Sequence, residues 1–158
     1  MRVLLALDDS DASLRAAGVA RRLFGPDPEY LALQVGRVIP TGMVADPTGL
    51  YVLPAEYWDA EAVTPDPYVT QARAEAAGVQ DIEVVTDAGD PVQRICEVAD
   101  EHEADVIVVG AHDKGFWRRL VDPSVSEGVL HRTNRPVLVV HEHAPLGSIT
   151  TTTVTPAG

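Results

Sequence analysis

The chain has 158 residues, of which 46% are hydrophobic, and a formal net charge of −12 at pH 7. This size and composition are typical of one globular domain with a hydrophobic core, while the negative charge argues against nucleic acid or an anionic membrane as a partner. Cys96 is the only cysteine, which excludes an intramolecular disulfide framework, and the apolar run at 3–7 is too short for a signal peptide or a membrane span. We therefore expect a cytoplasmic protein.

The N-terminal part of the chain predicts a strand followed by a helix. Residues 3–7 are all apolar, as in a strand that is buried on both faces. The four residues from Asp8 to Asp11 all suit an N-cap, so a helix is expected from here to about Phe24, where Gly25-Pro26 stops it. The helix residues expected to face inward are Leu14, Ala17, Gly18 and Leu23.

A second strand is predicted at 31–35, with a continuation toward Ile39, and a long segment without clear periodicity follows at 40–67. This segment is rich in proline and also carries aromatic residues. A loop of this length is usually either functional or mobile. Its aromatic side chains either close over a ligand or, more simply, pack against the domain surface; they are Tyr51, Tyr57 and Trp58.

The second half of the chain continues the alternation of helix and strand. Helices are predicted at 67–77 and from Gly89-Asp90-Pro91, which places a proline at the first helical position. Strands are predicted at 82–86 and at 106–109, where short runs are rich in β-branched residues. The helix that starts at Pro91 has an amphipathic face made of Val92, Ile95, Cys96 and Ala99.

Gly110 ends the strand at 106–109, and a polar loop then leads to a last helix. The helix begins either at Ser124, where Ser-Val-Ser-Glu has the form of a capping box, or at Asp122-Pro123. In either case its N–H groups and dipole make a natural anion site beside the loop, which three basic residues make slightly basic. The simpler alternative is that these residues only cap a helix.

The order of elements predicts a doubly wound α/β domain with an all-parallel sheet over residues 1–143. Residues 144–158 are rich in Thr, Pro and Gly and are expected to form a disordered tail. The sequence contains no P-loop and no nucleophile elbow, so no catalytic residue is assigned. His141 and His143 would lie on one side of a strand, but two histidines are a weak metal signal and no metal site is assigned.

Several stretches match one known family. They are LLALDDSDAS near the N-terminus, DAGDPVQRICEVADEHEADVIVVG before the loop, and PSVSEGVL and RPVLVV after it. In combination they resemble the universal stress protein family, over most of residues 1–141. ATP-binding members carry a strand ending in Gly, two residues, Gly, nine residues, and then Gly-Ser or Gly-Thr. This chain keeps the spacing with Gly110 and Ser124, but it has Asp113 and Pro123 in place of the second and third glycines.

The resemblance implies a five-stranded parallel sheet of order 3-2-1-4-5, with a nucleotide site where the first and fourth strands end side by side. It also implies that Asp8 contacts the adenosine and that the backbone at Val38 contacts the adenine. By the same resemblance, the candidate nucleotide-binding residues are Ala6, Leu7, Asp8, Val38, Val109, Gly110, His112, Asp113, Pro123, Ser124, Val125 and Ser126.

The two altered glycines indicate a degraded cleft. A carboxylate at Asp113 repels a phosphate unless a metal ion such as Mg²⁺ lies between them, and Pro123 has no N–H to donate. The sequence therefore favours a dimeric, non-catalytic regulatory or adaptor module of the stress response, with an unidentified protein partner. The alternative is a nucleotide switch or slow ATPase that binds ATP or AMP in the same cleft.

The last strand, which follows Pro136, is expected to form a homodimer. It is apolar, β-prone and free of charge, and in the order 3-2-1-4-5 it lies at the sheet edge, where unpaired N–H and C=O groups invite another chain. The tail after it is expected to be too polar to cover that edge. Two copies can pair their edges antiparallel about a two-fold axis, and the resemblance implies the same interface. The expected interface residues are Val137, Leu138, Val139 and Val140.

Overall fold

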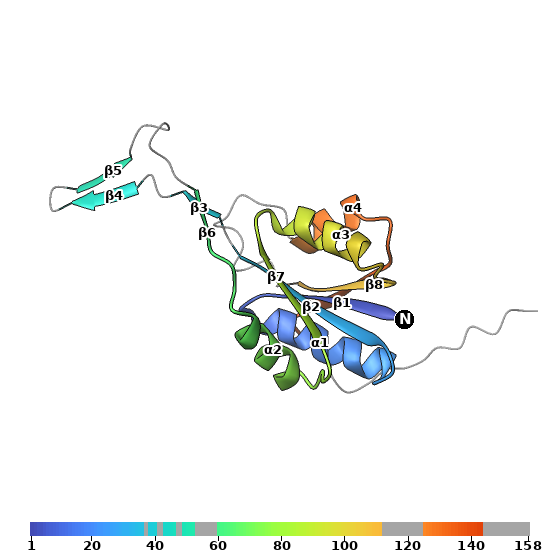
Figure 1. The fold of residues 1–158 in the computed structure, drawn as a ribbon. Helices are drawn as coiled ribbons and strands as arrows, with labels where there is room; N and C mark the ends of the chain where they lie inside the picture. The colour runs from blue at the N-terminus through green and yellow to red at the C-terminus, as the bar shows by residue number, and fades with distance from the viewer. Residues whose placement is uncertain (37, 41–42, 47–48, 53–59, 112–124, 144–158) are drawn as a thin grey trace, which may run out of the picture.

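The computed structural model describes residues 1–36, 38–40, 43–46, 49–52, 60–111 and 125–143. A five-stranded sheet lies between two layers of helices (Figure 1). The sheet strands are β1 (Arg2–Leu7), β2 (Glu29–Gly36), β7 (Glu83–Ala88), β8 (Val106–Ala111) and β9 (Val137–His141). The helices are α1 (Asp11–Phe24), α2 (Pro67–Ala76), α3 (Pro91–Glu101) and α4 (Val125–Arg132).

The strand order is β7-β2-β1-β8-β9, and each neighbouring pair is parallel. This confirms the predicted order 3-2-1-4-5. The chain moves from β1 outward through β2 to β7, and then returns to place β8 on the other side of β1. Strands β1 and β8 therefore lie side by side at the point where the direction of winding reverses, and Ala6 is in register with Val109.

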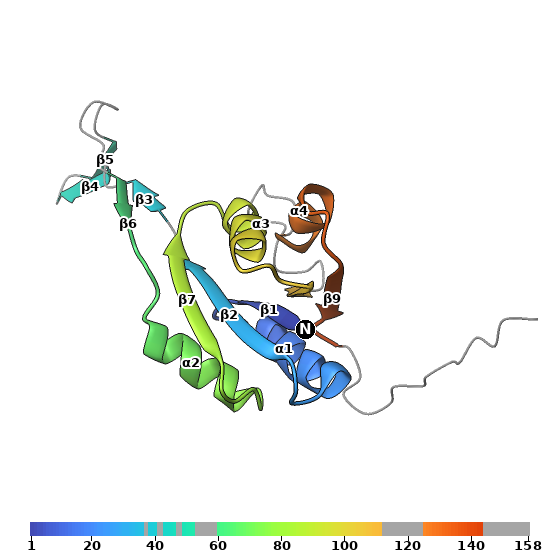
Figure 2. The same ribbon diagram turned by 45° about the vertical axis from the view of Figure 1, so that its right-hand side comes forward.

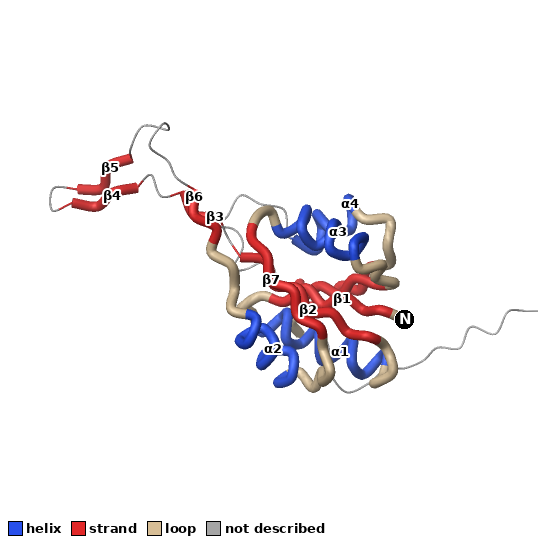
Figure 3. Tube along the Cα trace, in the orientation of Figure 1, coloured by secondary structure: helices blue, strands red, loops and turns tan. Residues whose placement is uncertain are grey.

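The two faces of the sheet are covered by different helix pairs, with α1 and α2 on one side and α3 and α4 on the other (Figures 2 and 3). Successive residues of a strand point to opposite faces. Val3 and Leu5 accordingly belong to the core beneath α1, whereas Leu4 belongs to the core beneath α3. All three side chains are at most 1% exposed, which is why the run at 3–7 is apolar throughout rather than alternating.

Helix α1 packs on the sheet through small residues. Its buried residues are Ala12, Ser13, Ala16, Ala17 and Ala20. The predicted inward position of Leu23 is wrong, because this side chain is 42% exposed, and Leu14 and Gly18 are only half-buried. The alanine face lets the helix backbone approach the sheet closely: a Cβ added to Gly110 would lie 2.6 Å from the carbonyl carbon of Ala12.

Helix α3 begins and packs as its sequence predicts. The Asp90 side chain accepts a hydrogen bond of 2.7 Å from the N–H of Gln93, and Pro91 occupies the first helical position. Ile95, Cys96 and Ala99 are buried, and Val92 packs against the same core. Burial raises the pKa of the Cys96 thiol, which fits a core residue rather than a reactive one.

Arg2 joins several elements at the amino-terminal ends of the strands. Its backbone N–H donates to Asp105 Oδ2 at 2.7 Å. Its guanidinium donates to Glu29 Oε2 through Nε at 3.0 Å and to the carbonyl oxygen of His102 through Nη1 at 2.7 Å. One side chain thus ties together the starts of β1 and β2 and the end of α3.

The expectation that residues 40–67 form a loop without regular structure is wrong. They contain two short antiparallel ladders, β3 (Val38–Pro40) with β6 (Ala60–Ala62) and β4 (Met43–Asp46) with β5 (Gly49–Val52). The β4–β5 ribbon projects away from the sheet in both views (Figures 1 and 2). The continuation of the second strand toward Ile39 is also wrong. Strand β2 stops at Gly36, whose missing Cβ would lie 1.8 Å from the carbonyl oxygen of Val63.

Within the described ranges, no helix has both the length and the apolar character needed to cross a membrane.

We predict opposite effects for two glycine-to-alanine changes. Gly110→Ala should lower the free energy of unfolding by about 1–3 kcal/mol, because the new Cβ collides with the backbone of α1. Gly18→Ala, within α1, should raise it by up to about 1 kcal/mol, because the nearest atom to its Cβ, at 3.5 Å, is in ordinary contact and alanine favours helix. Urea denaturation measures both. A neutral Gly110→Ala would show that α1 does not lie this close to β8.

Candidate functional site

The candidate site lies where β1 and β8 end side by side. Open α/β sheets bind ligands outside the carboxyl ends of their strands, at the position where the strand order reverses. Asp8 follows the last residue of β1, and Gly110 lies one residue before the end of β8. The packing of Gly110 against Ala12 places the start of α1 directly beside this edge.

The Asp8 carboxylate is held in place by the first turn of α1. The N–H of Ser10 donates to Asp8 Oδ1 at 2.9 Å, and the Ser10 hydroxyl donates to the same oxygen. Ser10 is also the N-cap, because its Oγ accepts the N–H of Ser13 at 3.2 Å. Ser10 therefore both holds the Asp8 carboxylate and caps α1, so the orientation of Asp8 depends on the start of the helix. Asp8 Oδ2 takes part in neither of these bonds.

Ser13 completes the turn from the buried side. Its hydroxyl lies 3.0 Å from the carbonyl oxygens of both Asp8 and Ser10, and it accepts the N–H of Asp8 at 3.2 Å. Ser13 is only 3% exposed, so these bonds satisfy polar groups that would otherwise be buried without partners. The segment from Asp8 to Ser13 is therefore a pre-formed turn.

A second layer of polar residues supports the turn from β2 and α2. Gln34 Nε2 donates to Asp9 Oδ1 at 3.3 Å, and the fully buried Thr70 hydroxyl donates to Gln34 Oε1 at 2.7 Å. Arg73 Nη2 donates to the carbonyl oxygen of Ser10 at 3.5 Å. Sequence reasoning missed these three residues. The one available signal was a glutamine inside the apolar run at 31–35.

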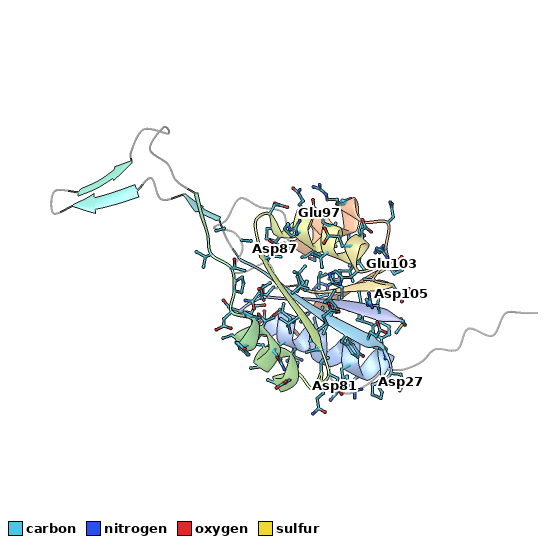
Figure 4. All side chains as sticks on the ribbon, in the orientation of Figure 1. Asp27, Asp81, Asp87, Glu97, Glu103 and Asp105 are labelled. Atoms are coloured by element: carbon cyan, nitrogen blue, oxygen red, sulfur yellow. The ribbon has the colours of Figure 1, made fainter. Side chains whose placement is uncertain are left out.

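A separate charged cluster lies at the carboxyl end of β7 (Figure 4). Arg94 donates to Asp87 through Nε at 2.7 Å and also forms an ion pair with Glu97. The pKa of Asp87 is lowered first by the N–H of Ala88 and then by Arg94, and that of Glu97 first by Gln93 and then by Arg94. Because Arg94 is engaged by two carboxylates, this cluster fastens α3 to β7 and offers no anion site.

The structure brings together part of the predicted site. Ala6 and Leu7 end β1, Val109 and Gly110 lie near the end of β8, and both pairs border the Asp8 turn. Val125 and Ser126 open α4, which connects β8 to β9 and so begins at the same edge of the sheet. Val38 lies in β3, just beyond the end of β2. The predicted site residues outside the described part of the chain are His112, Asp113, Pro123 and Ser124.

The two proposed starts of the last helix, Asp122-Pro123 and Ser124, also lie outside the described residues, and α4 is described from Val125. The same applies to the basic loop and to Tyr57 and Trp58. Among the described residues, no group of three or more His, Cys, Asp or Glu side chains is arranged to hold a metal ion.

Comparison with known families identifies this fold. The family model described as the universal stress protein family matches residues 1–141. The chain belongs to the universal stress protein family.

Individual universal stress proteins match this chain at low to moderate identity. Universal stress protein Rv1636 of Mycobacterium tuberculosis is 28% identical over 142 residues, which cover 88% of this chain and 94% of that protein. Universal stress protein MJ0577 of Methanocaldococcus jannaschii is 39% identical over 62 residues. That match covers 36% of MJ0577, and a match to stress response protein NhaX of Bacillus subtilis covers 55% of NhaX.

Solved universal stress protein structures share the fold over nearly the whole chain. A universal stress protein in complex with cAMP is 28% identical, covers 90% of this chain and 97% of its own, and has a TM-score of 0.59. The structure of MJ0577 is 18% identical, covers 91% and 97%, and has a TM-score of 0.58, which supports the fold alone.

The Asp8 turn yields a prediction about stability. Ser10→Ala should cost about 0.5–2 kcal/mol of the free energy of unfolding, because it removes the N-cap acceptor of α1. Ser10→Asn is the matched control, since asparagine caps helices as well as serine does and should leave the urea midpoint nearly unchanged. Equal losses in both variants would mean that the serine hydroxyl does not cap α1.

Proposed function

We propose that this universal stress protein is a cytoplasmic, non-catalytic regulatory module that responds to an adenine nucleotide in the cleft beside Asp8. The observation that carries the proposal is the pre-formed Asp8 turn at the reversal point of the sheet. A fixed carboxylate suits ribose hydroxyls, which donate hydrogen bonds to it; AMP and ATP offer the 2′ and 3′ hydroxyls, and cAMP offers the 2′ hydroxyl alone. The related structure in complex with cAMP, at 28% identity over 90% of the chain, supports this ligand class.

The absence of catalysis is part of the proposal. A nucleophilic serine needs a base that accepts its proton. The Ser13 hydroxyl is instead directed at backbone carbonyl oxygens, and the Ser10 oxygen, which donates to Asp8, is engaged as the N-cap acceptor of α1. These bonds stabilise the turn, and binding rather than bond cleavage is the function that they favour.

The phosphate side of the cleft favours a ligand with one phosphate group. Asp113 and Pro123 replace two glycines of the ATP-binding pattern. The carboxylate repels additional phosphate charge, and proline removes one N–H donor. AMP or cAMP carries less charge than ATP, so we propose that these nucleotides bind in preference to ATP. The second candidate is a nucleotide switch or slow ATPase in which Mg²⁺ bridges Asp113 and the triphosphate.

Calorimetric titration tests the proposal with cAMP, AMP and ATP, the last with and without Mg²⁺. Asp8→Asn should weaken binding of all three about 10- to 100-fold, because it removes a charge-assisted hydrogen bond worth roughly 1.5–3 kcal/mol. The double change Asp113→Gly and Pro123→Gly should instead strengthen ATP binding by about tenfold or more, with each change contributing on the order of 1–3 kcal/mol.

Asp9→Asn is the matched control for Asp8→Asn. It removes a neighbouring charge, but Asp9 is bonded to Gln34 and is not proposed to touch the ligand. The proposal fails if the unmodified protein binds none of the nucleotides. Tight ATP binding that requires Mg²⁺ and gains nothing from the double change would favour the switch instead.

We also propose that the module is a homodimer that pairs through β9, using Val137, Leu138, Val139 and Val140. The N–H of Ile107 donates to the Pro136 carbonyl at 2.9 Å, and the N–H of Glu142 donates to Ala111 at 3.0 Å. Because alternate residues of a strand direct their backbone groups to the same side, residues 136, 138, 140 and 142 face β8. Residues 137, 139 and 141 therefore present N–H and C=O groups to a second copy.

Val139→Pro should convert the dimer to a monomer, because it removes an outward N–H without touching the ladder to β8. Val139→Ala is the control: it loses the same apolar contacts with the core but keeps the N–H. Sedimentation at micromolar concentration measures the outcome. An unmodified protein that is monomeric under these conditions would exclude the dimer.

A further inference from the structure

Helix α2 exposes apolar residues where a surface helix normally exposes polar ones. Its two buried residues are Thr70 and Ala74, whereas Tyr68 is 80% exposed and Val69 is 52% exposed. A helix that lies on a sheet usually directs its larger apolar side chains at the core and its polar side chains at water. The exposed residues of α3 follow this rule, since they are Gln93, Asp100 and Glu101. The pattern of α2 is the reverse, so core packing does not account for Tyr68 and Val69.

The exposed apolar residues of α2 form one stripe along its outer face. Residues four and eight positions apart lie on the same side of a helix, which places the exposed Ala72 and Ala76 in line with Tyr68. Val69 borders this line, because it lies three positions before Ala72 and seven before Ala76. The α2 stripe, made of these four residues, is about 12 Å long, and its two alanines permit another backbone to come close.

The α2 stripe is held in its outward orientation by the two ends of a fixed arrangement. The Asp66 side chain accepts the N–H of Tyr68 at 2.8 Å and caps the helix, and Pro67 occupies its first position. On the inner side, the fully buried Thr70 hydroxyl donates to Gln34 Oε1 at 2.7 Å. Rotation of α2 to bury the stripe would break this buried bond, which is costly. The stripe is therefore already ordered and loses little conformational entropy when a partner binds.

The charges that border the α2 stripe are negative. Asp66 lies at its start, and Glu75, seven positions after Tyr68, lies beside it; both carboxylates are exposed. Arg73 is turned away from the stripe, because its Nη2 donates to the carbonyl oxygen of Ser10 at 3.5 Å. The whole chain has a formal net charge of −12. An apolar stripe with an acidic rim favours a partner in which positive charges flank apolar residues.

We propose that the α2 stripe binds an amphipathic helix of a partner protein, which carries apolar side chains on the facing side and Lys or Arg at its borders. Apolar residues at helical spacing are the anchors through which one helix packs on another. A second copy of this chain is a poor occupant of the same surface, because the packing of two stripes would bring two acidic rims together.

This surface is separate from the other two proposed binding regions. The α2 stripe includes none of the residues proposed for the nucleotide cleft. Helix α2 packs on β2 and β7, at the opposite end of the strand order from β9 (Figure 2). The docking of a partner helix is therefore compatible with the homodimer, and it stands whether or not a nucleotide binds.

The test uses the full chain and a synthetic peptide of about 18 residues, or five helical turns, made of Leu and Lys at the spacing of an amphipathic helix. One control peptide has the same composition in scrambled order, and the other has Glu in place of Lys. Fluorescence anisotropy of the labelled peptides measures binding. The Leu-Lys helix should bind about tenfold or more tightly than either control, because it alone matches both the stripe and its rim.

Tyr68→Ser with Val69→Ser should weaken binding of the Leu-Lys helix about tenfold or more, because it removes the two largest side chains of the stripe. The matched control is Leu23→Ser, which removes an exposed apolar side chain from α1 and should change the affinity by less than about twofold. All three positions are exposed, so the variants should fold, and their urea midpoints check this.

A charge reversal tests the acidic rim without altering the apolar residues. Glu75→Lys should weaken binding of the Leu-Lys helix, and the difference from the unmodified chain should shrink as salt is added. Glu101→Lys is the matched control, because it changes the net charge equally at an exposed position of α3. Equal weakening by both variants would mean that the overall charge, rather than the rim of the stripe, attracts the peptide.

Three further results would overturn the proposal. If the Leu-Lys helix does not bind, or binds the Tyr68→Ser, Val69→Ser variant as tightly as the unmodified chain, the stripe does not dock a helix. If either control peptide binds equally well, the partner is not a basic amphipathic helix. If sedimentation shows a smaller assembly for the Tyr68→Ser, Val69→Ser variant than for the unmodified chain, the stripe is covered by a second copy.

Discussion

The close approach of α1 to the end of β8 determines much of this structure. At Gly110 the backbones of the strand and of the helix come so near that a single Cβ would collide with Ala12. This contact explains why the buried face of α1 is made of alanines and a serine rather than leucines. It also places the Asp8 turn beside the end of β8. The glycine that resembles a ligand-binding residue in the sequence therefore has a packing role that is needed with or without a ligand.

The sequence was most informative where a single physical requirement acted locally. Runs such as Val3–Leu7 are apolar because both faces of a central parallel strand are buried, and Asp90-Pro91 marks a helix start through capping and a fixed φ. The strand order came from the family resemblance rather than from periodicity. Leu23 was wrongly assigned to the buried face as an apolar residue, whereas the close packing of α1 buries small side chains.

Features that depend on distant residues could not be predicted in this way. The end of β2 at Gly36 is set by the backbone at Val63, which passes over it. The contact from Thr70 through Gln34 to Asp9 joins α2, β2 and the Asp8 turn, and only Gln34, a polar residue in an apolar run, stands out in the sequence. The Asp8 turn is different, because its bonds lie within six consecutive residues and its outline was visible as a cluster of N-cap residues.

The two ends of the sheet serve different purposes, and this has a consequence for how the protein can evolve. Arg2 fastens the amino-terminal edge through Asp105, Glu29 and the carbonyl of His102, far along each strand from the Asp8 turn. These bonds do not involve the carboxyl ends of the strands. Substitutions at the carboxyl ends therefore leave intact the Arg2 bonds that hold the strands in register. The residues that follow β1 and β8 could therefore change in a lineage while the same scaffold is retained.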